Sequence, residues 1–142
     1  MKIRSDFVTN SSSSSFIIAY KTIPEIDQET INKYPFLSNY SKLIEKVLFT
    51  EGYNDTSAGE KITTKEEYDD YFINNYCWGD DTIDVIIEDD KYLCKQYNKV
   101  IKYLEEGFAI LIKDVDYNDT YCSNMIRELA KDKENFIILE DD

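Results

Sequence analysis

Acidic residues follow three apolar segments in the C-terminal half of the chain. Of all the residues in the sequence, these acids have the types and spacing that best suit a binding or metal site. They are Glu88, Asp89 and Asp90, then Asp114, Asp116 and Asp119, and finally Glu140, Asp141 and Asp142. If the three segments are parallel strands, their carboxyl ends lie at one edge of a sheet, where open α/β sheets bind ligands. The sequence therefore predicts an acidic rim that docks a basic protein surface.

The same carboxylates allow two other interpretations. Asp114, Asp116 and Glu88 offer the oxygen ligands that Mg²⁺ or Mn²⁺ prefers, which would suit a metal-dependent phosphoryl-transfer enzyme. Alternatively, Asp89 or Asp90, and Asn118 or Asp119, cap the helices that follow them, and the remaining acids are solvated surface. The sequence leaves these interpretations open and indicates no catalytic residue.

Composition excludes several classes of function. The chain contains no His, which removes the commonest general base and zinc ligand. Its Cys residues, Cys77, Cys94 and Cys122, form no CxxC pair for zinc binding or redox chemistry. A net charge of −13, from 29 acidic and 16 basic residues, repels nucleic-acid phosphates and anionic membranes. We therefore expect a basic protein partner, no direct nucleic-acid or membrane partner, and no cofactor unless Mg²⁺ or Mn²⁺ binds.

A run of five serines lies between two apolar, β-favouring stretches near the N-terminus. Its members are Ser11, Ser12, Ser13, Ser14 and Ser15. Their hydroxyl groups can satisfy nearby backbone groups in a polar strand or loop. They can equally be the sites at which a modifying enzyme acts, which makes this chain a possible substrate. We expect residues 1–20 to form a serine-rich arm that ends in a strand.

The residues around this run carry a resemblance. Arg4, Phe7-Val8-Thr9-Asn10, the five serines and Phe16 follow the pattern R-x-x-F-V-[ST]-N-S-S-S-S-S-F. This pattern resembles an N-terminal signature of uncharacterised bacterial and phage proteins and covers only about the first 17 residues. The resemblance implies a bacterial or phage origin. In that setting, the acidic chain would be a small non-enzymatic inhibitor that occupies the basic cleft of a nucleic-acid-binding protein.

The elements that must position the acids follow from hydrophobic periodicity. A length of 142 residues fits a single domain, residues 1–142. Residues 16–20 read as a strand, and residues 36–49 carry apolar side chains at helical spacing. Thr63 and Thr64 precede Glu66 and Glu67 as two overlapping capping boxes of another helix. The segment from residue 52 to residue 59 reads as a polar loop.

The C-terminal half predicts the fold class. Alternating Ile83, Val85 and Ile87 favour a strand at residues 82–88, and apolar runs favour strands at 108–115 and 136–139. Helical periodicity lies between them, so the order is β-α-β-α-β. We predict an α/β fold with about four strands in a mixed or parallel sheet and helices packed on it. The start of the chain lacks an apolar run long enough for a signal peptide or membrane span, so we expect a cytoplasmic protein.

Overall fold

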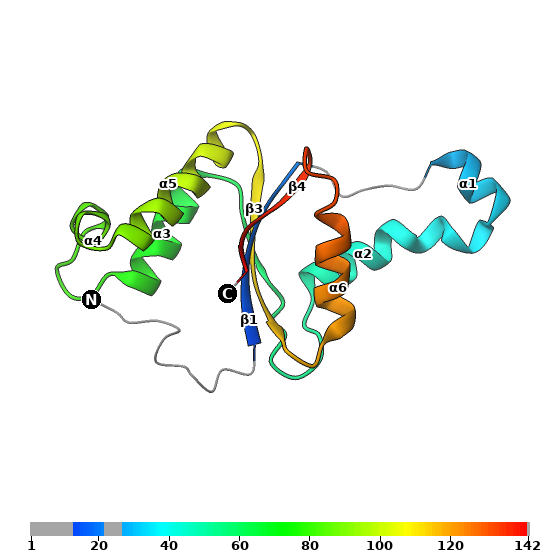
Figure 1. The fold of residues 1–142 in the computed structure, drawn as a ribbon, viewed down its shortest axis with the longest axis horizontal. Helices are drawn as coiled ribbons and strands as arrows, with labels where there is room; N and C mark the ends of the chain where they lie inside the picture. Colours follow the sequence, from blue (N-terminus) through cyan, green and yellow to red (C-terminus); the bar gives the residue numbers. More distant parts are fainter. Residues whose placement is uncertain (1–12, 22–26, 142) are drawn as a thin grey trace.

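A four-stranded sheet forms the centre of the protein and is seen nearly edge-on in Figure 1. The computed structural model describes residues 13–21 and 27–141. The strands are β1 (Ser13–Tyr20), β2 (Glu60–Ile62), β3 (Ala109–Asp116) and β4 (Phe136–Asp141). They lie in the order β2-β3-β1-β4, and each neighbouring pair is antiparallel. Strands from both ends of the chain therefore share one sheet.

Helices cover both faces of the sheet, which gives three layers (Figure 1). Helices α3, α4 and α5 lie on one face, and α2 and α6 lie on the other. Helix α1 and the 3₁₀ helix η2 lie beyond α2, far from the sheet, and α1 buries no residue. The helices are α1 (Gln28–Lys33), η2 (Pro35–Asn39), α2 (Tyr40–Phe49), α3 (Lys65–Tyr76), α4 (Ile83–Asp89), α5 (Lys91–Glu105) and α6 (Thr120–Leu129).

Strand β1 divides the core into two halves because its side chains alternate between the faces of the sheet. Ile17 and Ala19 belong to the half beneath α3 and α5. Phe16, Ile18 and Tyr20 belong to the half beneath α2 and α6. The predicted strand at residues 16–20 is confirmed, and it begins three residues earlier, within the serine run.

The prediction of a strand at residues 82–88 is wrong. These residues form most of α4, so the C-terminal half does not follow the order β-α-β-α-β. Ile83, Ile86 and Ile87 recur at i, i+3 and i+4 and pack against the core, which is helical spacing. Val85, which the alternating pattern required to be inside, is exposed. The sequence of this segment fits both the two-residue repeat of a strand and the 3.6-residue repeat of a helix, and the fold buries its helical face.

The sheet is antiparallel and not parallel or mixed as predicted. Strands β3 and β4 are connected by α6 but are not neighbours, because β1 lies between them. Both are antiparallel to β1, so they run in the same direction, as in a split β-α-β arrangement. The carboxyl ends of β3 and β4 therefore lie at the same edge of the sheet, on either side of the first residues of β1.

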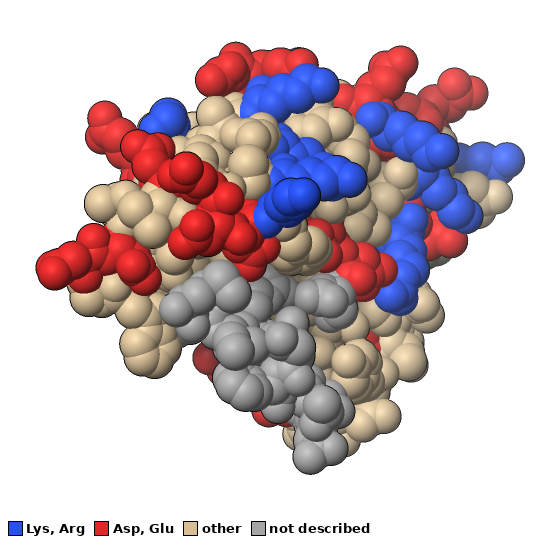
Figure 2. Space-filling model, turned by 60° about the vertical axis from the view of Figure 1, so that its left-hand side comes forward, with Lys and Arg blue, Asp and Glu red and all other residues tan. Residues whose placement is uncertain are grey.

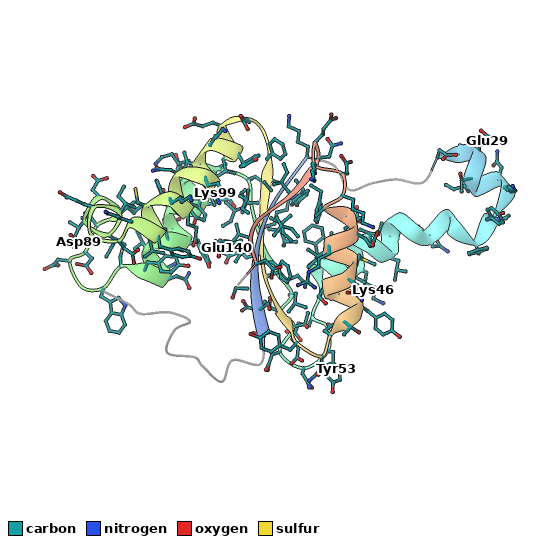
Figure 3. All side chains as sticks on the ribbon, viewed as in Figure 1. Glu29, Lys46, Tyr53, Asp89, Lys99 and Glu140 are labelled. Atoms are coloured by element: carbon teal, nitrogen blue, oxygen red, sulfur yellow. The ribbon has the colours of Figure 1, made fainter. Side chains whose placement is uncertain are left out.

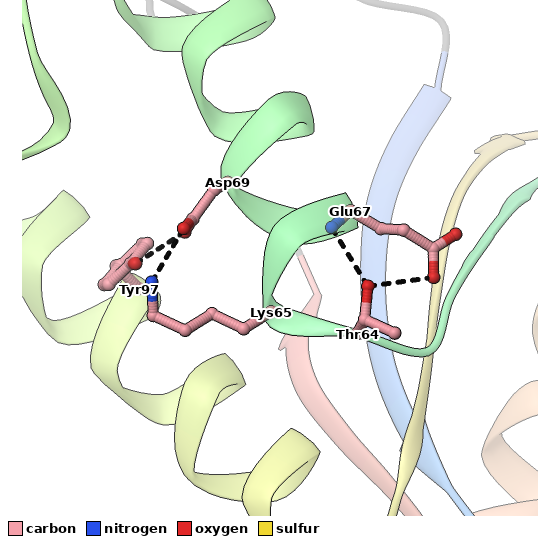
Figure 4. A network of polar contacts seen from close by, with 5 residues as sticks. All are labelled: Thr64, Lys65, Glu67, Asp69 and Tyr97. Atoms are coloured by element: carbon pink, nitrogen blue, oxygen red, sulfur yellow. Dashed lines mark hydrogen bonds and ion pairs between the residues drawn. The ribbon is translucent and has the colours of Figure 1, made fainter.

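Several local predictions are confirmed. Thr64, and not Thr63, is the N-cap of α3, so of the two predicted boxes the one formed by Thr64 and Glu67 is present: the Glu67 amide donates to Thr64 Oγ1, and the Glu67 carboxylate accepts from the Thr64 hydroxyl (Figure 4). The backbone amide that Glu67 binds is that of Thr63, one residue before the N-cap. Asp90 and Asp119 cap α5 and α6. The helix expected at residues 36–49 is present, although its first turn belongs to η2. None of the helices in residues 13–21 and 27–141 combines the length and the hydropathy needed to cross a membrane.

Candidate functional site

The three acids at the end of β3 have different environments. Asp114 is exposed, and its Oδ1 atom accepts a hydrogen bond of 2.8 Å from the Ser15 hydroxyl of β1. The backbone of Asp114 bonds to Ser57 on the other side, since its carbonyl accepts from the Ser57 amide and its amide donates to Ser57 Oγ. Asp114 is therefore an open carboxylate at a well-anchored strand end.

Asp116 and Asp119 are buried, being 3% and 8% exposed, and they hold the loop of residues 50–57. Asp119 Oδ2 accepts hydrogen bonds from Thr56 Oγ1 at 2.8 Å and from the Tyr53 amide at 3.1 Å. Asp116 Oδ2 accepts from the Asp55 amide at 3.2 Å, and the Asp116 amide donates to Thr56 Oγ1 at 2.9 Å. We call Thr56, Asp116 and Asp119 the loop clamp. The carboxylates of two of the predicted rim residues are thus buried and engaged in hydrogen bonds that hold this loop.

Lys113 completes the anchoring of this loop from inside the protein. Its side chain is fully buried, and Nζ donates hydrogen bonds to the carbonyl oxygens of Thr50, at 3.1 Å, and of Ser57. Burial lowers the pKa of Lys113 because the charged ammonium is desolvated. Burial also raises the pKa of the Cys122 thiol to about 11, and the charge of Lys113 only partly opposes that effect.

The predicted acids near residue 90 do not come from a strand end. Glu88 and Asp89 are exposed residues of α4, and Figure 3 shows Asp89 at the outer end of the helical layer, away from the sheet. Asp90 lies between α4 and α5, where Oδ1 accepts hydrogen bonds from the amides of Tyr92 and Leu93. The predicted convergence of three strand ends is therefore wrong for these three residues, and the alternative reading of Asp90 as an N-cap is confirmed.

The acids at the end of β4 are engaged with side chains of the two helical layers. Glu140 Oε1 accepts a hydrogen bond of 2.6 Å from the Tyr92 hydroxyl of α5. Asp141 forms an ion pair of 3.3 Å with Arg127 of α6. Adjacent residues of β4 thus contact helices on opposite faces of the sheet.

The suggested metal ligands are not brought together as one set. Glu88 lies on α4, whereas Asp114 and Asp116 lie on β3, and Asp116 is bonded to backbone amides. Within residues 13–21 and 27–141, no group of three or more His, Cys, Asp or Glu side chains is arranged to hold a metal ion.

The serine run lies only partly within the described chain. Ser13, Ser14 and Ser15 form the first residues of β1 and are half-buried, while Ser11 and Ser12 are outside the described residues. The signature residues Arg4 to Asn10 are outside them as well. The Ser15 hydroxyl bonds to a carboxylate of the neighbouring strand. Modification of the serines stays a prediction.

Sequence reasoning missed three tyrosines that surround the end of β3. Tyr53 and Tyr117 are more than half exposed, and Tyr121 is 89% exposed. Asp119 holds their backbones together, because it binds the Tyr53 amide while Tyr117 and Tyr121 lie two residues before and after it. We call Tyr53, Asp114, Tyr117 and Tyr121 the tyrosine–acid rim, and Figure 3 shows Tyr53 at this end of the molecule. The available signal was that Tyr121 lies outside the apolar face of α6 and that Tyr117 lies in the turn before this helix.

Comparison of this chain with protein-family models, with curated proteins and with solved structures finds no match in any of the three.

Proposed function

We propose that this chain is a small interaction protein whose tyrosine–acid rim docks a basic surface of a partner protein. The observation that supports the proposal most strongly is the exposure of three tyrosine rings on the loop and turn that Asp119 joins after the end of β3, the strand in which the Asp114 carboxylate is also exposed. Tyrosine is enriched at the energetically dominant centres of protein interfaces. The faces of its ring attract Lys and Arg side chains, as does a carboxylate. The rim therefore matches a cationic and not an anionic ligand.

The loop clamp supports the proposal because its hydrogen bonds hold the segments that carry the rim in place before a partner arrives. Thr56, Asp116 and Asp119 fix the loop that carries Tyr53 against the turn that carries Tyr117. A surface that is ordered in advance loses less conformational entropy on binding. The buried carboxylates of Asp116 and Asp119 would thus contribute to docking indirectly, because they position the tyrosine rings.

The charge of the whole chain supports the same class of partner. A net charge of −13 favours encounter with a positively charged protein and opposes binding to free nucleic acid. Acidic side chains form clusters on the surface around α3–α5, separated by smaller groups of Lys and Arg (Figure 2). The partner we propose is therefore a basic, nucleic-acid-binding protein, which this chain would inhibit by occupying the cleft.

A photo-crosslinking experiment tests the proposal. Tyr121 is replaced by p-benzoylphenylalanine in the source cells, and Tyr34, an exposed residue at the end of α1, is replaced in a matched control. Irradiation should link the Tyr121 position, and not the Tyr34 position, to a protein with a basic surface. Crosslinks from both positions to the same proteins, or to acidic proteins only, would contradict the proposal.

A further inference from the structure

The sheet has an open edge at β2, on a surface distinct from the tyrosine–acid rim. Strand β2 pairs with β3 on one side, and no other strand of the described chain pairs with its outer side. An edge strand presents unpaired backbone amides and carbonyls on its outer side, which another extended chain can match.

The register shows which backbone groups point outward. Both the amide and the carbonyl of Asp114 bond toward Ser57, on the β2 side of β3. In an antiparallel ladder every second residue points the same way, so Ile112 and Ile110 direct their groups to Glu60 and Ile62. Lys61, which lies between those two, therefore directs its amide and carbonyl away from the sheet. Lys61 is exposed.

A groove runs beside this edge, between β2 and α3. Its volume is about 240 Å³, and its lining includes Glu60, Glu67, Asp70 and Asn74. Side chains alternate along a strand, so Glu60 lies on the same face as the buried Ile62, which is the face that α3 covers. The side chain of Lys61 lies on the opposite face. Lys61 also lines the groove, so its lining carries three carboxylates against one lysine, and the groove is acidic on balance.

One of these carboxylates is fixed in place. Glu67 Oε1 accepts hydrogen bonds from the Thr63 amide, at 3.2 Å, and from the hydroxyls of Thr63 and Thr64. Figure 4 shows the Glu67 side chain turned toward the strands. These hydrogen bonds, mainly those from Thr63, lower the pKa of Glu67 and keep the group ionised. A carboxylate held by its own capping box needs little reorganisation to meet a cation.

We propose that an extended peptide segment bearing Lys or Arg joins the sheet as a strand at the outer side of β2. Its backbone would bond to the amide and carbonyl of Lys61, and its basic side chains would meet Glu60, Glu67 and Asp70 in the groove. A second copy of this chain is disfavoured at the edge because it would bring the same three carboxylates against themselves. The charge of the groove therefore selects a basic segment of another protein.

In the test, a short peptide of alternating threonine and lysine is titrated into the ¹⁵N-labelled full chain, and binding is followed in the NMR spectra of the chain. We expect chemical-shift changes centred on Lys61 and on the lining of the groove. The same peptide with glutamate in place of lysine should not bind. A lysine peptide whose inward-facing amides are N-methylated should not bind either. Absence of binding by the lysine peptide, or equal binding by all three peptides, would overturn the proposal.

Two substitutions at one position separate strand addition from simple attraction. Lys61→Pro removes the outward amide, and an edge strand tolerates proline there because that amide has no partner in the sheet. Lys61→Gln removes the same charge but keeps the amide. We expect Lys61→Gln to bind the lysine peptide at least as well as wild type and Lys61→Pro to lose binding. Equal affinity of the two variants, both folded by circular dichroism, would contradict strand addition.

The acids of the groove are tested by a matched pair of variants with the same net charge. Glu60→Gln combined with Asp70→Asn should weaken the lysine peptide by about tenfold, or about 1.4 kcal/mol. Glu88→Gln combined with Asp89→Asn, on the exposed surface of α4, should leave its affinity unchanged. An equal loss in both double variants would mean that the net charge, and not the groove, holds the peptide.

Discussion

Replacing Asp119 by alanine removes the acceptor on which three donors converge. The Tyr53 amide, the Thr56 hydroxyl and the Cys122 amide all donate to its carboxylate. Loss of an N-cap side chain costs about 1 kcal/mol, and a buried donor left without a partner costs about 1–3 kcal/mol. Water can reach some of these donors once the loop opens. We expect Asp119→Ala to lower the free energy of unfolding by roughly 2–4 kcal/mol.

Urea unfolding measures this loss, and amide hydrogen exchange locates it. Exchange at Tyr53 and Thr56 should accelerate more than exchange in β1 because the loop opens before the sheet does. Asp114→Ala is the matched control, since it removes an exposed carboxylate from the same strand end and should cost less than about 1 kcal/mol. If Asp119→Ala and Asp114→Ala have the same stability, or if loop exchange is unchanged, the clamp does not hold the loop.

Three further predictions follow from particular contacts. Gly52→Ala should cost about 1–3 kcal/mol in urea unfolding, because a Cβ atom there would lie 2.5 Å from a carboxylate oxygen of the loop clamp. The pKa of the Cys122 thiol is raised from its ordinary value of 9.0 to about 11 in the native state. The stability that the protonated thiol provides is therefore complete below pH 9.0 and is lost as the pH rises through about 11. The difference in unfolding free energy between wild type and Cys122→Ala should shrink over that range. Tyr97→Phe removes a 2.6 Å hydrogen bond to Asp69 and should cost about 1 kcal/mol by thermal unfolding, whereas Lys65→Met removes an exposed ion pair and should lower the melting temperature by less than Tyr97→Phe does (Figure 4).

The local elements were largely predictable because caps and periodicity are local signals. The capping box of α3, the caps Asp90 and Asp119, and the apolar runs of β3 and β4 all behaved as their patterns indicated. The prediction for residues 82–88 was wrong because Ile86 completes a helical stripe with Ile83 and Ile87, and the fold buries that stripe instead of the alternating set that includes Val85. Strand β2 has only three residues, too few for any period to show.

The order of strands was not predictable in the same way. The position of β1 between β3 and β4 depends on pairing between segments that are far apart in the sequence. The apolar run of β1 would suit a parallel strand as well as an antiparallel one, so its pattern does not show which way its neighbours run. As a result, two of the three expected strand ends lie at one edge, while the third group of acids lies on a helix.

The sequence indicated the end of β3 as the place of the candidate site, but it did not indicate which of the acids there are exposed and which are buried. The end of β3 was identified from Asp114, Asp116 and Asp119, yet the sequence did not show that two of them are buried. Burial depends on the loop of residues 50–57, which folds back onto β3 from far away in the chain. Lys113 was missed for the same reason, although it lies on the same face of β3 as the buried Leu111 and Val115.

The measurement that tests docking at the tyrosine–acid rim most directly is the affinity for the crosslinked basic partner as a function of salt. Isothermal titration is performed from about 50 mM to about 500 mM NaCl, a range over which charge attraction between exposed groups is progressively screened. We expect wild-type affinity to fall steadily with salt, and Tyr117→Ser combined with Tyr121→Ser to weaken binding by about tenfold at low salt. Tyr34→Ser should match wild type. Affinity that depends neither on ionic strength nor on the two rim tyrosines would contradict the account.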